Sequence, residues 1–278
     1  MKRRAWAVWF LLLCLLLSAC RGTRSAPPLR IHFLDVGQGD AVLLRTREGD
    51  VLLDAGPEAA QETLCLRLEQ LGVTELELAI FTHMDEDHVG GADGILRQIP
   101  TKEIWVNNYA FPNPSAERMR LAAEQTGAPI RVANPKETVV FGEVVLSTLA
   151  PLEADVGTGN EGSLAIRLQC GVSSALFTGD AGIEQEQRLI EEYGDALLDC
   201  DLYKVGHHGS GTSSGELFLA YLSPQYAVVS CGEANRYGHP FGEVLANLEA
   251  VGATVLRTDL LGEIVFECDG ETLWMPAK

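Results

Sequence analysis

The feature that most constrains this chain is an apolar run that ends in a cluster of side chains able to bind metals. Leu76–Phe81 has the composition of a buried strand, and His83, Asp85, Asp87 and His88 follow directly after it. Imidazole nitrogens mixed with carboxylate oxygens suit a divalent transition metal, bound as one ion or as a pair. A solvated acidic loop is the alternative interpretation, but it does not account for two histidines in phase with two aspartates. The segment therefore predicts a metal site at the end of a strand.

Three more segments place an acidic or imidazole side chain directly after an apolar, strand-like run. They end in Asp54, in Asp180, and in the pair His207 and His208. A lone aspartate after a strand is usually a turn or helix-cap residue. Because strand ends on one edge of a sheet converge, several such segments in one chain predict a single cleft that contains these side chains.

Short strand-like runs alternate with amphipathic helical patterns along the whole chain. Strands are predicted at 29–36, 41–46, 51–55, 76–81, 103–106, 139–140, 144–149, 164–168, 175–178, 201–205, 226–229, around 255, at 264–266 and at 272–274. Helices are predicted at 57–71, 91–99, 114–125, 183–193, 215–222 and 241–251. No linker rich in proline or serine separates two halves. The pattern favours one α+β domain over 29–278, with two packed sheets and helices outside them.

Residues 1–19 have the pattern of an export signal, with a basic start, an apolar core and small residues at the end. The apolar core is shorter than the roughly 20 residues of a spanning helix. The ending Leu17-Ser18-Ala19-Cys20 resembles a bacterial lipobox, which predicts lipidation of Cys20 and a flexible stalk over 20–28. We therefore expect a lipoprotein anchored on the extracytoplasmic face of the cell membrane. Plain secretion is the alternative.

The formal net charge of −18 limits the partners. An acidic surface repels polyanions at long range, so tight non-specific binding to duplex DNA is not expected. An anionic substrate has to be held locally, by metal ions and by candidate cations at Lys204, Arg236 and Arg257. The five cysteines after Cys20 lie mostly in apolar runs and lack a Cys-x-x-Cys pair. They predict no zinc ribbon and leave the pairing of any single disulfide open.

Together these segments resemble the metallo-β-lactamase fold superfamily, whose His-x-His-x-Asp-His signature stands here as His83-x-Asp85-x-Asp87-His88. The chain is more narrowly similar to the hydrolase domain of ComEC-type competence proteins, the DNA-uptake channel family. The residues that carry this similarity are Asp35-Val36-Gly37-Gln38-Gly39-Asp40-Ala41, Asp54-Ala55-Gly56, Gly162-Ser163-Leu164, Thr178-Gly179-Asp180, His207-His208-Gly209-Ser210 and Tyr237-Gly238-His239-Pro240. The resemblance runs from about 29 to 266, without that family's membrane channel. It implies an αββα sandwich of two mixed sheets.

The resemblance also implies a role for each candidate metal ligand. Asp87, His88 and either His207 or His208 would hold one metal, and Asp180 would bridge to a second. His83 and Asp85 would supply that second metal. We favour His208 as the ligand, because a His-Gly ending recurs at this position in the fold. Two ions would share a hydroxide that attacks phosphorus or an acyl carbon.

Three other residues are expected close to the metals. Asp54 is expected to orient the ligand loop through hydrogen bonds, as carboxylates behind metal ligands do. Asp40 is expected to line the cleft, with a turn-stabilising role as the alternative. His239 is a candidate catalytic residue beside Asp87 and Asp180, since it would contact a substrate phosphate or protonate a leaving group. A turn before a helix is the alternative interpretation of His239.

The sequence departs from the superfamily pattern in one respect. The superfamily usually supplies a third histidine to the second metal from the region that here reads Asn160-Glu161-Gly162-Ser163-Leu164. With Asp85 also replacing a histidine, the ligand set is richer in oxygen. This favours a harder ion such as Mn²⁺, or a weakly held second ion, over a tight pair of Zn²⁺ ions.

The resemblance implies a metallohydrolase that acts as a phosphodiesterase or nuclease. It points to a phosphodiester substrate, in particular single-stranded nucleic acid, and to the DNA-uptake machinery as a partner. Two alternatives stay open: a cell-envelope phosphodiesterase acting on teichoic-acid-type substrates, and a non-catalytic metal-binding surface lipoprotein. β-Lactam hydrolysis is disfavoured because the ligand set differs from that of the antibiotic hydrolases.

Overall fold

The computed structural model describes residues 27–108, 110–152 and 159–277. The signal peptide predicted at 1–19 and Cys20, which was predicted to be lipidated, lie outside these ranges. Within them, no helix combines the length and the apolar character needed to cross a membrane.

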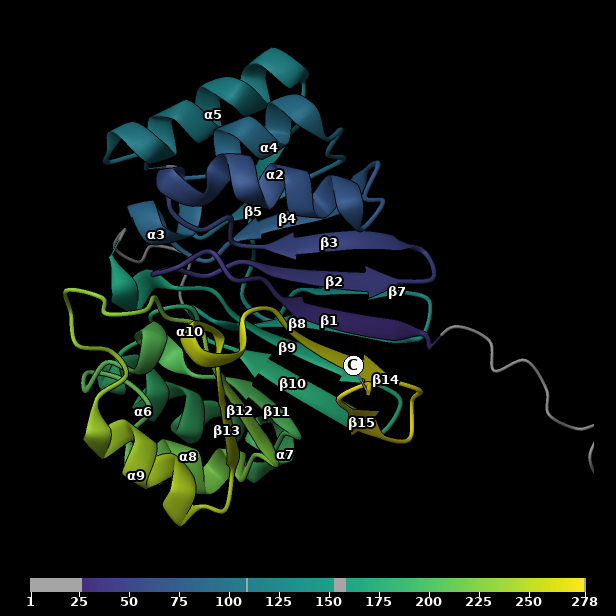
Figure 1. Ribbon diagram of the computed structural model, residues 1–278. Coiled ribbons are helices and arrows are strands. Elements are labelled where there is room, and N and C mark those ends of the chain that lie inside the picture. Colours follow the sequence, from purple (N-terminus) through teal and green to yellow (C-terminus); the bar gives the residue numbers. More distant parts are fainter. Residues whose placement is uncertain (1–26, 109, 153–158, 278) are drawn as a thin grey trace, which may run out of the picture.

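The described residues form two mixed β-sheets (Figure 1). The first sheet has the strand order β15 (Leu273–Trp274), β14 (Ile264–Cys268), β1 (Leu29–Phe33), β2 (Val42–Thr46), β3 (Gly49–Leu53), β4 (Leu76–Phe81), β5 (Ile104–Val106) and β6 (Ile130–Val132). Its strands from β15 to β3 pair antiparallel, and those from β3 to β6 pair parallel.

The second sheet has the order β13 (Thr254–Arg257), β12 (Tyr226–Val229), β11 (Leu202–Lys204), β10 (Ser173–Phe177), β9 (Ala165–Cys170), β8 (Val144–Ala150) and β7 (Thr138–Phe141). Its pairing is parallel from β13 to β10 and antiparallel from β10 to β7. Both sheets are therefore mixed, as the resemblance implied.

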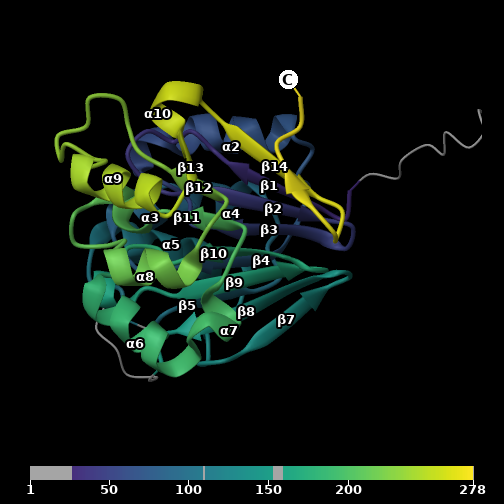
Figure 2. The same cartoon turned by 90° about the horizontal axis from the view of Figure 1, so that it is seen from below.

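Helices cover the outer face of each sheet. Over the first sheet lie α2 (Gln61–Gln70), α3 (Glu86–Val89), α4 (Ala92–Gln98) and α5 (Pro114–Thr126). Over the second lie α6 (Ile183–Tyr193), α7 (Asp195–Leu198), α8 (Glu216–Leu222) and α9 (Gly242–Ala250), and the view from below (Figure 2) has α6, α8 and α9 in the foreground. A short helix, α10 (Thr258–Leu261), joins β13 to β14. The predicted αββα sandwich is confirmed.

Packing on both faces explains why so many strands are continuous apolar runs. In β2, Val42 and Leu44 point into the core between the sheets, whereas Leu43 packs under the helices of the first layer. Side chains alternate between the two faces of a strand, so a sheet covered on both faces needs apolar residues at every position. Phe33, Phe177 and Phe266 meet in the central core, with Phe33 stacked on Phe177 at a centroid distance of 6.1 Å.

The predicted elements match the structure closely where the hydrophobic pattern is strong. Helix α6 and strand β12 have the predicted bounds, and α5 begins at Pro114 with Asn113 as its cap. The side chain of Asn113 accepts a hydrogen bond from Ala116 N at 3.0 Å. Strand β6 was not predicted, because its three residues Ile130–Val132 are interrupted by Arg131 and carry no periodic signal.

The predicted site residues all follow strand ends at one edge of the sandwich. Asp54 follows β3, His83 follows β4, Asp180 follows β10, and the short 3₁₀ helix η3 (Gly206–Gly209) follows β11. In Figure 1 this edge is the left-hand end of the sheets, where α3 lies, and β1 begins at the right-hand end. Five cysteines in the described ranges are buried and free, so the one disulfide that the sequence left open is not formed among them.

Candidate metal centre

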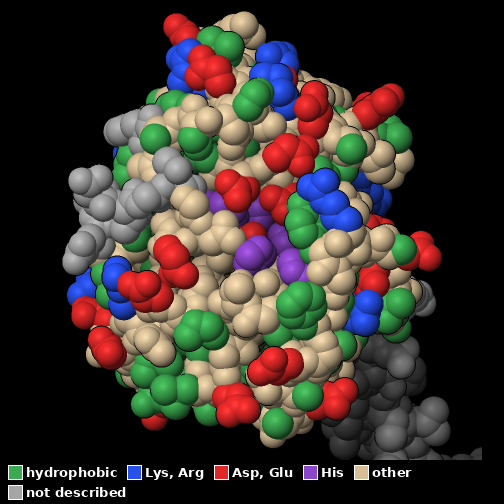
Figure 3. Space-filling view, turned by 90° about the vertical axis from the view of Figure 1, so that its left-hand side faces the viewer, with side chains coloured by type: hydrophobic (Ala, Val, Ile, Leu, Met, Phe, Trp, Pro, Cys, Tyr) green, Lys and Arg blue, Asp and Glu red, His purple; other side chains and the backbone are tan. Residues whose placement is uncertain are grey.

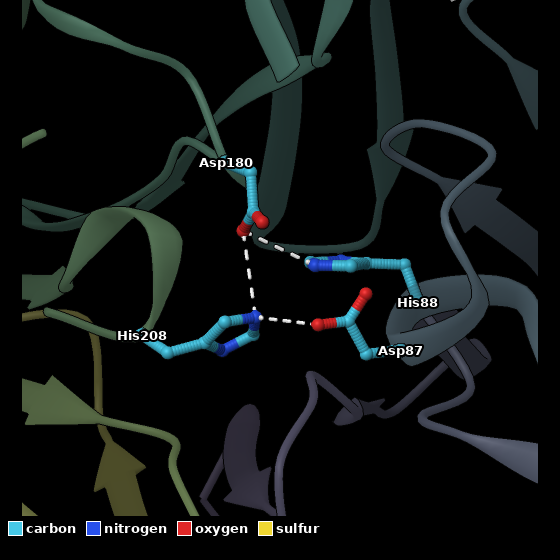
Figure 4. A group of neighbouring side chains, drawn as sticks. All are labelled: Asp87, His88, Asp180 and His208. Carbon is cyan, nitrogen blue, oxygen red and sulfur yellow. Dashed lines mark ion pairs between the residues drawn. The ribbon is translucent and has the colours of Figure 1, made fainter. Parts of the chain in front are cut away.

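Four side chains from distant segments converge to form a candidate metal site (Figure 4). Asp87 and His88 come from α3, Asp180 from the turn after β10, and His208 from η3. One ligand atom of each lies within 4.8 Å of the others. His88 Nε2 is 3.1 Å from Asp180 Oδ1, and His208 Nε2 is 3.3 Å from Asp87 Oδ2 and 3.7 Å from Asp180 Oδ1.

Four atoms in or beside this cluster are buried without a hydrogen-bond partner among the described residues. They are the Nε2 atoms of His83, His88 and His208, together with Asp180 Oδ1. A buried polar atom left unpaired costs on the order of 1–3 kcal/mol, so several in one place call for a ligand. A divalent cation satisfies imidazole nitrogens and carboxylate oxygens at once. The residues present therefore fit a metal ion.

Asp180 lies between two groups of side chains. Its Oδ1 atom faces His88 and His208, and its Oδ2 atom lies 3.9 Å from His83 Nε2 and 3.5 Å from His207 Nε2. Asp85 Oδ2 is 3.8 Å from His83 Nε2 on the same side. Asp180 therefore lies between two groups of possible metal ligands.

The two adjacent histidines of η3 differ in their surroundings. The His208 side chain is 1% exposed, and its Nδ1 atom lies 3.0 Å from Ser230 O, which directs Nε2 into the cluster. The His207 side chain is 24% exposed, and its Nδ1 atom lies 3.0 Å from Thr212 Oγ1. Both residues have positive φ angles, +49° for His207 and +55° for His208, a conformation that persists only where surrounding contacts enforce it. The cluster includes His208 and leaves His207 at its edge.

Asp54 is placed behind His88 and not among the converging Nε2 atoms. It accepts hydrogen bonds from Thr82 N and Thr82 Oγ1, both at 2.8 Å, and lies 2.8 Å from His88 Nδ1. A carboxylate on Nδ1 fixes the ring so that Nε2 is free to bind a metal. Thr82 was not predicted to be part of the site, although its position directly before His83 could have indicated it.

Asp40 supports His208 in the same manner. Its Oδ1 atom is 3.2 Å from His208 Nδ1, and its Oδ2 atom is 2.5 Å from Lys204 Nζ. Lys204 was expected in a cationic patch for phosphate, but it is 2% exposed and neutralises Asp40. In the sequence, Lys204 ends an apolar strand, and that position was the signal from which its burial could have been predicted.

The electrostatics of the cluster favour positive charge at its centre. Burial lowers the pKa of His208, but Asp180 and Asp40 outweigh it and raise that pKa to about 9. Burial likewise lowers the pKa of His88, whereas Asp180 and Asp54 raise it well above its usual range. Burial and then the neighbouring His88 lower the pKa of His83 to about 4. The carboxylates thus favour the protonated forms of His88 and His208, whereas burial and the charge of His88 favour a neutral His83.

His239 lies at the rim of the site. Its ring centroid is 5.7 Å from that of His207 and 6.4 Å from that of His208. Figure 3 shows histidine side chains in a hollow of this face, with acidic side chains around it. Of the other predicted cations, Arg257 pairs with Asp259, and Arg236 lies over the ring of Tyr237.

The segment without the expected third histidine also lies beside the site. Asn160, in the 3₁₀ helix η2 (Asn160–Gly162), has its Nδ2 atom 3.4 Å from both ring nitrogens of His207. Ser163 Oγ accepts a hydrogen bond from Asp180 N at 3.2 Å. This segment therefore lies beside the candidate metal site and brings the Asn160 amide next to His207.

Comparison with known proteins shows the family and the fold of this chain. The family model described as "Metallo-beta-lactamase superfamily" matches residues 34–233. Among solved structures, the metallo-beta-lactamase fold protein YhfI from Bacillus subtilis superposes with a TM-score of 0.58 at 13% identity, covering 86% of this chain and 100% of that one. At this identity the likeness concerns the fold alone.

Two curated relatives are competence proteins. ComE operon protein 3 from Bacillus subtilis is 30% identical over 85% of this chain and 32% of its own length. Competence protein ComA from Neisseria gonorrhoeae is 35% identical over 84% of this chain and 31% of its own length. The chain thus spans about a third of the length of these relatives. It belongs to the metallo-β-lactamase superfamily and, within it, is similar to the ComEC-type competence proteins.

Proposed function

We propose that this chain is a metal-dependent phosphodiesterase that cleaves single-stranded nucleic acid outside the cytoplasm. The observation that carries the proposal is the convergence of Asp87, His88, Asp180 and His208, whose Nε2 and carboxylate atoms face one another in a buried cluster. Members of this superfamily are usually metal-dependent hydrolases, and the matched relatives are competence proteins.

The residues divide into two ligand groups around Asp180. Asp87, His88 and His208 would hold the first ion, and His83 with Asp85 would hold a second and weaker one. When bound, a divalent ion such as Zn²⁺ or Mn²⁺ supplies Lewis-acid activation of water and of a phosphoryl oxygen. Asp54 and Asp40 orient His88 and His208 through their Nδ1 atoms.

His239 is the proposed proton donor to the leaving oxygen. Its ring is at the rim of the site, and its Nδ1 atom has no hydrogen-bond partner among the described residues. Burial, followed by the charges of His208 and His207, lowers its pKa below its usual value. To act as the donor, the His239 ring has to be protonated when substrate binds; it would give that proton to the leaving oxygen and become a neutral imidazole.

The charge of the protein limits how it meets a polyanion. With a formal net charge of −18, the surface does not attract a phosphate chain at long range. Binding therefore depends on contacts at the cleft, and we propose distributive cleavage of flexible single strands. A link to the DNA-uptake machinery rests on the similarity to competence proteins and is part of the same proposal.

The proposed lipid anchor at Cys20 is consistent with the position of the cleft. β1 begins at the end of the sheets opposite to α3 and the metal cluster (Figure 1). A tether that leads into β1 would therefore leave the cleft turned away from the membrane and open to substrate. Lipidation is tested by metabolic labelling with a radioactive fatty acid, in which Cys20→Ala removes the label.

The direct test of function uses bis(p-nitrophenyl) phosphate and a single-stranded oligonucleotide as substrates, with Mn²⁺ or Zn²⁺ added to metal-free protein. We expect turnover that requires metal and falls at least 100-fold in His88→Ala, whereas Asp50→Asn, on the buried strand β3 away from the cluster, retains it. Turnover of neither substrate by folded, metal-loaded protein would reject the proposal. For a non-catalytic lipoprotein holding one ion, Asp180→Ala would leave function intact, and an envelope enzyme would cleave a polyol phosphate instead.

A further inference from the structure

A stack of planar side chains leads outward from the metal cluster. The Tyr237 ring is stacked on the His239 ring, with a centroid distance of 5.6 Å and an interplanar angle of 21°. The guanidinium carbon of Arg236 lies 4.8 Å from the centroid of the Tyr237 ring. Tyr237 is 47% exposed, and Arg236 is also exposed, so this stack offers planar surface to solvent beside the cleft.

The segment that carries the stack is rigidly built around one amide. Asn235 Nδ2 donates to Gly232 O at 3.0 Å and to His239 O at 2.7 Å. Asn235 Oδ1 accepts from Tyr237 N at 3.2 Å and from His239 N at 3.0 Å. All four bonds close the turn on itself, so the backbone that carries Tyr237 and His239 is held in place.

The same segment is fixed to the loop that carries His208. Phe241 N donates to Gly209 O at 2.9 Å. A Cβ atom at Gly209, whose φ is +83°, would lie only 2.5 Å from Pro240 Cβ, so the two loops are in direct contact. The position of the stack relative to the metal ligands is therefore set by the fold.

The charge of Arg236 suits a ligand that joins a planar ring to an anionic group. It is exposed, and its guanidinium Nη2 donates to Tyr237 Oη at 2.6 Å. A planar cation that is stacked on an aromatic ring presents a surface for a base and a positive charge for the adjoining phosphate. Lys204 and Arg257 are engaged by Asp40 and Asp259, so neither takes this role.

We propose that Tyr237 and Arg236 form a stacking site for the nucleobase next to the phosphodiester that is cleaved. The inference rests on the proposed function, and it adds that the enzyme recognises a base and not only a phosphodiester. Stacking accepts any of the bases, because each has a π-face, so the site selects unpaired strands without selecting sequence. A base within a duplex is stacked on its neighbours and is not available to Tyr237.

The test compares a thymidine oligonucleotide with an oligonucleotide of the same length that carries an abasic residue beside the single cleavable linkage. We expect wild-type protein to have a KM about 5- to 150-fold lower for the thymidine substrate, the range that corresponds to stacking of one base. In Tyr237→Ala this preference should fall to about one, and in Tyr237→Phe, which keeps the ring, it should persist. Arg236→Gln should reduce it in part.

The outcomes separate this proposal from the one on which it rests. Failure of wild-type protein to cleave either oligonucleotide rejects the nuclease function itself. Cleavage of both with equal KM shows a nuclease without a stacking site. An equal loss of kcat on both substrates in Tyr237→Ala, with the preference retained, means that Tyr237 only positions His239 and overturns the stacking proposal.

Discussion

The Nδ1 atom of His88 lies 2.8 Å from Oδ2 of Asp54, on the opposite side of the ring from Asp180. The same carboxylate accepts two hydrogen bonds from Thr82, so its orientation is fixed before it meets the histidine. Asp54 itself has a φ of +56°, which an asparagine also tolerates. The contact ties the end of β3 to the loop after β4 and would make His88 a preset ligand for the proposed metal ion.

Asp54→Asn should therefore weaken metal binding while leaving the fold intact. Asparagine keeps the shape and one acceptor but loses the charge that orients His88, and such changes behind a ligand typically cost 10–100-fold in affinity. Titration of metal-free protein with Mn²⁺ or Zn²⁺ by calorimetry measures the change. Asp50→Asn, at the other end of the same strand and paired with Arg45, is the matched control. Equal affinities in both variants would contradict a role for Asp54.

The two histidines of η3 make a second prediction, because they differ in burial and direction. His208→Ala removes a buried nitrogen that faces Asp87 and Asp180, so metal affinity should fall by at least 100-fold. His207→Ala removes a partly exposed ring at the edge of the cluster, so the affinity of the tighter ion should change less than 10-fold. Measuring the metal that stays bound after gel filtration in both variants shows which of the two histidines is the ligand. A larger loss in His207→Ala would reverse the assignment.

Gly39 brings the loop after β1 into contact with α3, the helix that carries Asp87 and His88. A Cβ atom there would lie 2.4 Å from Asp87 O and 2.8 Å from Pro57 Cδ, and Asp40 N donates to Asp87 O at 3.1 Å. Gly39→Ala should lower the free energy of unfolding by about 2–4 kcal/mol and also weaken metal binding, because the clash displaces Asp87. Gly37→Ala has no atom within 4 Å of its new Cβ atom and a φ of +73°, so only about 1–2 kcal/mol of backbone strain is expected. Denaturant titrations and metal titrations of the two variants test this difference.

Much of this architecture could be predicted from the sequence because its signals are local. The apolar strands, the strand-end histidines and aspartates, and helices such as α6 are each encoded within a few neighbouring residues. What the sequence could not show are contacts between distant segments. The pairing of Lys204 with Asp40 is an example, since it depends on the packing of β11 against the loop after β1 and leaves no trace in either segment alone. The residues alone did not separate His207 from His208 as the ligand for the same reason, because the answer depends on which ring the backbone turns inward.

Glu186 gives a prediction about stability and pH that does not involve the metal ligands. Its carboxylate, on α6, accepts hydrogen bonds from Ser214 N and from Gly215 N, the latter at 3.0 Å, at the start of α8. Burial raises its pKa from the usual 4.5 to about 7, although these two bonds oppose the shift. A raised pKa means that the folded protein binds this proton more tightly than the unfolded chain does. The stabilisation is therefore complete below about pH 4.5 and is lost as the pH rises through 7.

Replacing Glu186 with glutamine should remove this pH dependence, since the amide is a permanent analogue of the protonated acid. We expect the wild-type free energy of unfolding to fall by about 1–3 kcal/mol more than that of Glu186→Gln between pH 5 and pH 8. Denaturant titrations at several pH values in one metal-free buffer measure this, with Glu184→Gln as the control on the exposed face of the same helix, where Glu184 pairs with Arg188. The control should follow the wild-type curve. A parallel course of the wild type and Glu186→Gln would mean that Glu186 is ionised in the folded protein over this range, and that its two backbone hydrogen bonds outweigh the cost of its burial.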